Sequence, residues 1–201
     1  MKVCMVGEAA VGKTSLVRRF VLDLFNEAYA ATLGARVTKR ELHFKGVEVD
    51  KHVRVDMTLW DIMGERFVRD ELRESYLLGA QGVIAVADIA RPSTMDALEV
   101  WIDWVRNAVG EVPVVYSVNK IDLLAELMRK PNDEEIEGLF GMKDVFWFYT
   151  SAKTGQGVED VFAAVAKQVL AEVLDYQIQA VPKSARPTPN MADLPRGPIG
   201  P

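Results

Sequence analysis

An eight-residue stretch, GEAAVGKT at positions 7–14, separates a short apolar run from a segment with helical periodicity. Its two glycines permit backbone torsions that other residues resist, so consecutive N–H groups can curl around an anion. The first turn of the following helix would add the positive end of its dipole. The pattern G-x-x-x-x-G-K-[ST] between a strand and a helix therefore predicts a phosphate-binding loop.

The loop supplies the first candidate ligands. We expect phosphate contacts from every residue of the loop and from the start of the helix: Gly7, Glu8, Ala9, Ala10, Val11, Gly12, Lys13, Thr14 and Ser15. Lys13 would place a positive charge on the β- and γ-phosphates, and Thr14 would offer its hydroxyl to Mg2+. The loop alone does not identify the nucleotide, because ATPases, kinases and GTPases share it.

Short apolar runs alternate with helical segments along the rest of the chain. Four runs are almost continuously apolar, as strands buried on both faces are: 2–6, 82–88, 112–118 and 144–150. Residues 37–44 carry charges throughout, as an edge strand does, and residues 53–61 alternate. A short polar turn joins these two runs, which predicts a long hairpin.

Apolar stripes at helical spacing predict one helix over 93–109 and a last helix beginning near Val158. Together these elements predict an α/β fold of the P-loop NTPase type: a mostly parallel six-stranded sheet with one antiparallel edge strand and helices on both faces. Six of the 9 prolines lie beyond residue 177, in a segment without a core-forming pattern. We therefore expect a domain over 1–176 and a disordered tail over 177–201.

Composition excludes several classes of protein. A net charge of -5 argues against a broad nucleic-acid-binding surface. No run approaches the roughly 18 apolar residues that a membrane span needs. The single cysteine, Cys4, allows no internal disulfide, so a reducing cytoplasm is the expected location. His43 and His52 both fall in the predicted hairpin, where solvated residues are expected rather than a metal pair.

Two motifs indicate which base the protein binds. NKID (119–122) follows one predicted strand and SAK (151–153) follows the next, so both reach the sheet edge where α/β folds bind ligands. Asp122 could accept hydrogen bonds from N1–H and the amino group of guanine, whereas adenine would present a lone pair to the carboxylate. The backbone N–H of Ala152 could meet the guanine carbonyl. Together the motifs favour guanine.

The order GEAAVGKT, Thr32, WDIMG, NKID and SAKTGQGV resembles that of a Ras-like small GTPase, and SAKTGQGV, TLGA and the WD pair are most similar to the Rab branch. The resemblance covers residues 1 to about 175. It implies a switch that binds GTP and GDP with Mg2+, hydrolyses GTP, and reports the γ-phosphate to effector, exchange-factor and GTPase-activating proteins.

The resemblance also implies roles for single residues. Thr32 and Asp61 would hold Mg2+ together with Thr14, and the N–H of Gly64 would contact the γ-phosphate. Catalysis would involve Lys13, Thr32, Gly64 and the residue at position 65. The guanine pocket would be formed by Phe25, Asn119, Lys120, Asp122, Ser151, Ala152 and Lys153, and Tyr29 would close over the phosphates.

Several residues depart from the family pattern. Glu65 stands where a water-orienting glutamine is usual, either by substitution or by loss of one residue. A carboxylate cannot donate to the γ-phosphoryl oxygens, which predicts slow hydrolysis, although a carboxylate base would act in the opposite sense. An alternative is a GTP-binding module of the same fold with little hydrolysis.

Ala30 and Ala31 precede Thr32, so the chain has no built-in arginine there to stabilise the transferred phosphate, and a partner would have to supply one. No terminal cysteine for prenylation is seen, which leaves membrane association open.

Overall fold

The structure is a computed structural model that describes residues 1–26, 32, 34–45, 52–64, 70–127 and 146–174. These residues form a six-stranded sheet with the strand order β2-β3-β1-β4-β5-β6. Its strands are β1 (Lys2–Val6), β2 (Ala35–Lys45), β3 (His52–Ile62), β4 (Gly82–Asp88), β5 (Val114–Asn119) and β6 (Phe146–Tyr149). Only the β2–β3 pair among them is antiparallel. The predicted sheet, with its antiparallel edge strand, is confirmed.

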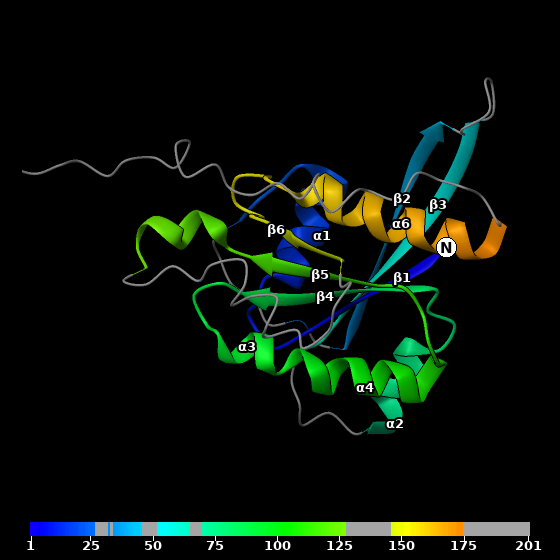
Figure 1. Cartoon of the computed structure of the whole chain (residues 1–201), viewed down its shortest axis with the longest axis horizontal. Coiled ribbons are helices and arrows are strands. Elements are labelled where there is room, and N and C mark those ends of the chain that lie inside the picture. The colour runs from blue at the N-terminus through cyan, green and yellow to red at the C-terminus, as the bar shows by residue number, and fades with distance from the viewer. Residues whose placement is uncertain (27–31, 33, 46–51, 65–69, 128–145, 175–201) are drawn as a thin grey trace, which may run out of the picture.

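Helices cover both faces of the sheet. They are α1 (Lys13–Leu22), α2 (Asp70–Leu77), α3 (Ser93–Asp96), α4 (Leu98–Val109), α6 (Val158–Leu174) and a 3-10 helix η1 (Ile121–Ala125). In Figure 1, α1 and α6 lie on one side of the sheet, and α2, α3 and α4 lie on the other. Right-handed crossovers place α1 and α4 on opposite faces, because the connection from β1 runs toward β3 and the connection from β4 runs the other way along the sheet, toward β5.

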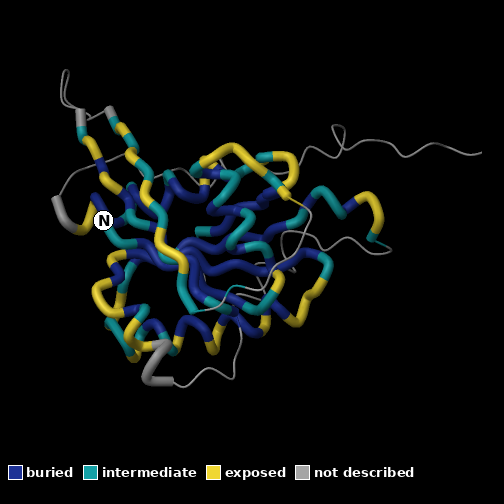
Figure 2. Tube along the Cα trace, turned by 180° about the vertical axis from the view of Figure 1, so that it is seen from behind, coloured by how far each residue is buried: buried dark blue, intermediate teal, exposed yellow. Residues whose placement is uncertain are grey.

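The core is divided by the sheet into two apolar clusters, and the central strands are buried along nearly all of their length (Figure 2). On the α1–α6 face, the rings of Phe20 and Phe162 stack with centroids 3.9 Å apart. On the α4 face, the buried Trp101 meets Trp104 edge to face with centroids 4.9 Å apart. Burial raises the pKa of the Cys4 thiol to about 12, so this cysteine is an unreactive core residue.

The predicted helix over 93–109 is wrong in one respect, because α3 ends at Asp96 and α4 begins at Leu98. Ala97 between them keeps right-handed helical torsions, with φ −66° and ψ −20°. The amide of Trp101, however, lies 3.4 Å from the carbonyl oxygen of Ala97, beyond the usual range for a helical hydrogen bond. The stripe of apolar residues predicted the buried face correctly, but the spacing of apolar residues cannot reveal that one turn of the helix is weakened.

The hairpin of β2 and β3 is in register from Ala35 opposite Ile62 to Lys45 opposite His52. Its predicted turn lies outside the described residues, as does the tail over 177–201. His43 is exposed and its Nε2 lies 2.7 Å from Oε1 of Glu41.

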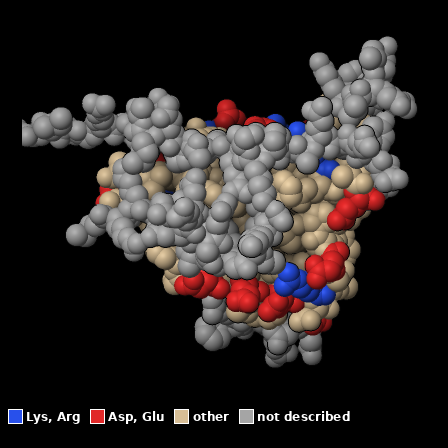
Figure 3. All heavy atoms as spheres, viewed as in Figure 1, with Lys and Arg blue, Asp and Glu red and all other residues tan. Residues whose placement is uncertain are grey.

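Acidic side chains gather over α4 in the view of Figure 3, which matches the negative net charge. None of the described helices is long and apolar enough to cross a membrane.

Candidate nucleotide-binding site

The candidate ligands lie along one edge of the sheet. The phosphate loop follows β1, the NKID motif begins at the last residue of β5, and residues 151–153 follow β6. These strands run parallel, so their carboxyl ends point to the same edge. The hydrogen-bonding partners of these segments, described below, show that they contact one another.

Lys13 lies at the centre of the phosphate loop and is only 6% exposed. Its Nζ donates to the carbonyl oxygen of Gly7 at 2.7 Å and to that of Glu8 at 2.8 Å. Burial lowers the pKa of Lys13 to about 8, although the charges of Asp61 and Glu8 raise it. The ammonium group is thus held inside the loop, where a bound anion would stabilise its charged form.

The start of α1 has the features of an anion site. Gly12 is its N-cap, so the N-cap position has no side chain to bond to the first turn. The first N–H groups of a helix without a side-chain cap can donate to an anion. A side chain at Gly12 would collide with Nδ2 of Asn119, so glycine is required for this close approach.

Ala10 holds the loop in an unusual backbone conformation. Its φ is +60°, in the left-handed region where an L-residue other than glycine costs on the order of 1 kcal/mol. Strain of this kind persists only where surrounding contacts hold it in place. The contacts that hold Ala10 are therefore relevant to the shape of the phosphate loop.

Three oxygen-bearing side chains meet beside Lys13. Oγ1 of Thr14 donates to Oδ2 of Asp61 at 2.5 Å and lies 2.9 Å from Oγ1 of Thr32. Asp61 is 1% exposed, and its Oδ1 has no hydrogen-bond partner among the described residues. Burial raises the pKa of the Asp61 carboxyl, whereas the Thr14 hydroxyl and the Lys13 charge lower it. A carboxylate and two hydroxyls suit Mg2+, and a cation would satisfy the unpaired Oδ1.

Gly64 packs directly against the phosphate loop. A Cβ added to Gly64 would lie 2.5 Å from Nζ of Lys13 and 2.6 Å from the backbone nitrogen of Ala9. No side chain fits in this space, so only glycine permits the contact. The residue predicted to sense the γ-phosphate therefore lies next to the loop predicted to hold it.

The base motifs are tied to each other and to the phosphate loop. Nδ2 of Asn119 donates to the carbonyl oxygen of Val11 at 2.9 Å. Oγ of Ser151 donates to Oδ1 of Asp122 at 2.5 Å, which orients the carboxylate. The N–H of Ala152, predicted to meet the guanine carbonyl, donates to Oδ1 of Asn119 at 3.3 Å.

Arg19 of α1 holds the loop that follows β6, a role that no motif indicated. Its Nε donates to the carbonyl oxygen of Ala152 at 2.8 Å, and its Nη2 donates to that of Lys153 at 2.7 Å. Its Nη1 donates to Oδ1 of Asp23 at 2.9 Å. The helix that starts at the phosphate loop thus also anchors the SAK segment.

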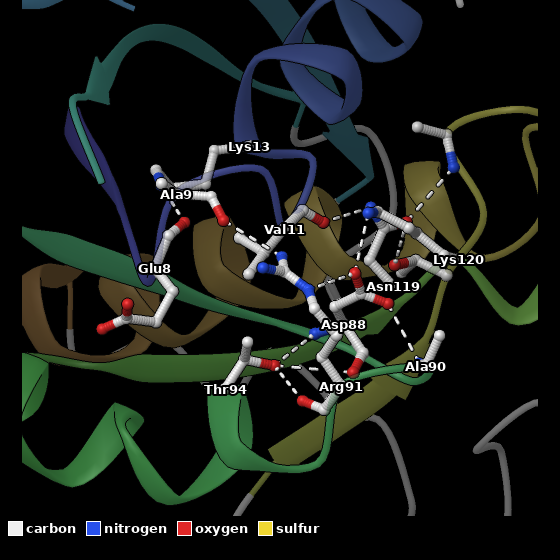
Figure 4. A network of polar contacts seen from close by, with 12 residues as sticks. Glu8, Ala9, Val11, Lys13, Asp88, Ala90, Arg91, Thr94, Asn119 and Lys120 are labelled. Carbon is white, nitrogen blue, oxygen red and sulfur yellow. Dashed lines mark hydrogen bonds and ion pairs between the residues drawn. The ribbon is translucent and has the colours of Figure 1, made fainter. Parts of the chain in front are cut away.

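Asp88 and Arg91 are two further site residues that the sequence did not single out. Asp88 ends β4 at the ligand edge, and both residues contact the predicted ligands (Figure 4). The position of Asp88 at the end of a buried strand was the signal that could have identified it. Phe25 is partly buried against the α1–α6 core cluster. Tyr29 and Glu65 lie outside the described residues.

The sheet order, the loop after β1 and the polar side chains at the sheet edge define an α/β domain of the P-loop NTPase type. The sequence profile of the Ras family matches residues 2–171. The chain therefore belongs to the Ras family, and its relatives place it among the Rab-like members. It is a small GTPase in this general sense, a class of guanine-nucleotide-binding switch.

Three relatives illustrate this similarity. The chain is 31% identical to the GTP-binding protein ypt5 of Schizosaccharomyces pombe, over 85% of this chain and 78% of that protein. It is 32% identical to the Ras-related protein Rab-13 of Rattus norvegicus, over 84% of this chain and 79% of that protein. It is also 32% identical to the Ras-related protein Rab-32 of Mus musculus, over 90% of this chain and 80% of that protein.

Proposed function

We propose that this protein is a Mg2+-dependent molecular switch that hydrolyses GTP slowly and signals through the loops around Thr32 and Gly64. The observation that carries this proposal is the cluster of Thr14, Thr32 and Asp61 oxygens beside the ammonium group of Lys13. A cation and a terminal phosphate brought to this cluster would bind the two switch loops together.

Other residues of the chain would bind the phosphates and select the base. Lys13 and the N–H groups of the phosphate loop would neutralise the phosphates, and the N–H of Gly64 would contact the terminal one. Asp122, held by the Ser151 hydroxyl, would select guanine. Thr14, Thr32 and Asp61 would hold Mg2+, which would supply positive charge to stabilise the phosphates.

Glu65 is the residue on which the rate depends. A glutamine amide could donate to the γ-phosphoryl oxygens and accept from water, but a carboxylate can only accept, and its charge opposes theirs. We infer that Glu65 slows hydrolysis. The alternative function, a GTP-binding module with little hydrolysis, is favoured by the same residue and differs only in how far the rate falls.

Single-turnover GTP hydrolysis tests the proposed function. We expect wild-type protein to hydrolyse bound GTP slowly and to lose this activity when Mg2+ is chelated. Glu65→Gln should be at least roughly tenfold faster, because it restores a donor to the reacting phosphate. Glu74→Gln, which makes the same charge change at an exposed position of α2, should match wild type. Equal rates for wild type and Glu65→Gln would refute the role of Glu65, and an absence of wild-type turnover would favour the binding module.

The hairpin next to the switch loops offers a surface for partners. Val37 of β2 is 47% exposed and lies opposite Trp60 of β3. Nζ of Lys2 lies 3.8 Å from the centroid of the Trp60 ring, which fixes the orientation of the indole. We propose that effectors and regulators contact this apolar surface together with the switch loops. The predicted cytoplasmic location stays a prediction.

Substitution of Val37 by aspartate tests the partner surface. We expect Val37→Asp to lose binding to proteins that distinguish the GTP-loaded from the GDP-loaded form, because a charge would be buried at the contact. Its affinity for GDP should not change. Val100→Asp, at a position of α4 that is 40% exposed, is the matched control and should keep partner binding. If Val37→Asp bound such partners as wild type does, the surface would lie elsewhere.

A further inference from the structure

A turn after β4 connects the two parts of the candidate site. Asp88 is 2% exposed, and its Oδ2 accepts a hydrogen bond from Nζ of Lys120 at 2.7 Å and one from Nε of Arg91 at 3.0 Å. Nη2 of Arg91 donates to the carbonyl oxygen of Ala9 at 3.0 Å (Figure 4). One carboxylate therefore joins the NKID motif to the phosphate loop through Arg91.

The backbone that carries Arg91 is held in place by its own hydrogen bonds. The N–H of Arg91 donates to the carbonyl oxygen of Asp88 at 2.9 Å, and the N–H of Ala90 donates to Oδ1 of Asp88 at 3.0 Å. Oγ1 of Thr94 accepts from the N–H of Asp88 at 2.9 Å and donates to the carbonyl oxygen of Arg91 at 2.7 Å. Little backbone freedom is therefore left to lose when Arg91 contacts the loop.

The contact at Ala9 fixes the orientation of one peptide group. A trans peptide is planar, so its C=O and N–H point in opposite directions. Since Arg91 binds the carbonyl oxygen of Ala9, the N–H of Ala10 is directed away from Arg91. Ala10 is also the residue with a φ of +60°. The guanidinium group therefore stabilises the strained peptide of the loop predicted to hold phosphate.

We propose that Arg91 is a positioning residue that slows nucleotide release by holding the Ala9–Ala10 peptide against Asp88 and Lys120. This inference rests on the proposed guanine-nucleotide site. The link is separate from the bond between Asn119 and Val11, which joins the same motifs at the next part of the loop. Two separate connections therefore join the base pocket to the phosphate loop.

The geometry favours this role over a direct catalytic one. An arginine that stabilises a transferred phosphate must be free to place its N–H groups on it. Nε of Arg91 is bound to the Asp88 carboxylate, and its Nη2 is bound to the Ala9 carbonyl oxygen. With these two hydrogen bonds the side chain bridges the turn after β4 and the phosphate loop.

The dissociation rate of a fluorescent GDP from full-length protein tests the proposal. We expect Arg91→Ala to release GDP roughly tenfold faster, because hydrogen bonds to a charged group are lost. Arg91→Lys should recover part of the effect, since one ammonium can reach a single partner. Arg106→Ala is the matched control, because Arg106 also pairs with an aspartate three residues earlier, at 3.3 Å from Asp103. It should release GDP at the wild-type rate.

Two combined variants test how Arg91 acts. In an Ala10→Gly background, Arg91→Ala should have a smaller effect, about threefold or less, because glycine adopts positive φ without strain. Asp88→Asn should accelerate release, and adding Arg91→Ala to it should cause little further acceleration, since both act through one link.

Specific outcomes would overturn the proposal. An unchanged release rate for Arg91→Ala, or an undiminished effect in the Ala10→Gly background, would show that Arg91 does not hold this peptide. Loss of single-turnover hydrolysis with normal GDP release would instead assign Arg91 to the reacting phosphate. Wild-type protein that failed to bind GDP would refute the proposed function itself, which separates that failure from a failure of this inference.

Discussion

Replacing Lys13 with alanine is expected to weaken GDP binding by roughly 100- to 1,000-fold, the range for removing one member of a buried, hydrogen-bonded charge pair. Lys13 is 6% exposed, and its Nζ is bound to the carbonyl oxygens of Gly7 and Glu8. Truncation would remove the positive charge available to the phosphates and leave these two carbonyl oxygens without their donor. Equilibrium titration with fluorescent GDP measures the loss.

The control for this variant is another lysine whose loss changes the net charge equally. Lys39 is exposed on the edge strand β2, so Lys39→Ala should bind GDP as wild type does. Lys13→Arg should also bind poorly, because the larger guanidinium does not fit the space between the loop and Gly64. A GDP affinity of Lys13→Ala within twofold of wild type would mean that Lys13 does not contact the phosphates.

Replacing Asp122 with asparagine is expected to reduce the affinity for GDP by roughly 100-fold, because an amide cannot accept from both N1–H and the amino group of guanine. The amide oxygen can still accept from the Ser151 hydroxyl, which donates to Oδ1 of Asp122 at 2.5 Å in wild type. The NH2 group would then face the base. Xanthine carries a carbonyl where guanine has its amino group, so the same variant should gain affinity for xanthosine diphosphate.

Competition against a fluorescent nucleotide measures both changes. Asp103→Asn removes the same charge from an exposed position of α4 and should retain the wild-type preference for GDP. If Asp122→Asn kept that preference, the base would be recognised elsewhere. An ATP preference in wild type would contradict the guanine assignment altogether.

The strands were predicted best where burial is complete. Residues 82–88 are apolar almost without interruption, every residue of β4 is buried, and the strand has the predicted bounds. β5 begins at Val114 and not at 112, because Pro113 has no N–H to give to the sheet. Its carbonyl oxygen still accepts from the N–H of Val83 at 2.9 Å. Strand ends therefore depend on single hydrogen bonds that an apolar pattern does not encode.

The candidate site was predictable where a motif specifies the backbone as well as the side chain. The phosphate loop, Asp61, Gly64 and the two base motifs lie together, while their individual roles stay predictions. Arg19 and Arg91 were not predictable in this way. Arg19 binds the carbonyl oxygen of Ala152, 133 residues away, and any residue type presents such an oxygen. Nothing in the local sequence marks a side chain whose partner is a distant backbone group.

Helix α1 determines how far apart the phosphate loop and the SAK segment lie, in addition to making contacts with both. It begins at Lys13 in the phosphate loop, and six residues later Arg19 holds the segment beside the predicted base. A helix rises 1.5 Å per residue, so about 9 Å of stiff backbone separates these two points. The helix thus sets the distance between the phosphate loop and the segment beside the predicted base. A ligand with a base but no β-phosphate would reach only the Arg19 end of the helix, so we expect the chain to bind it less tightly than a diphosphate.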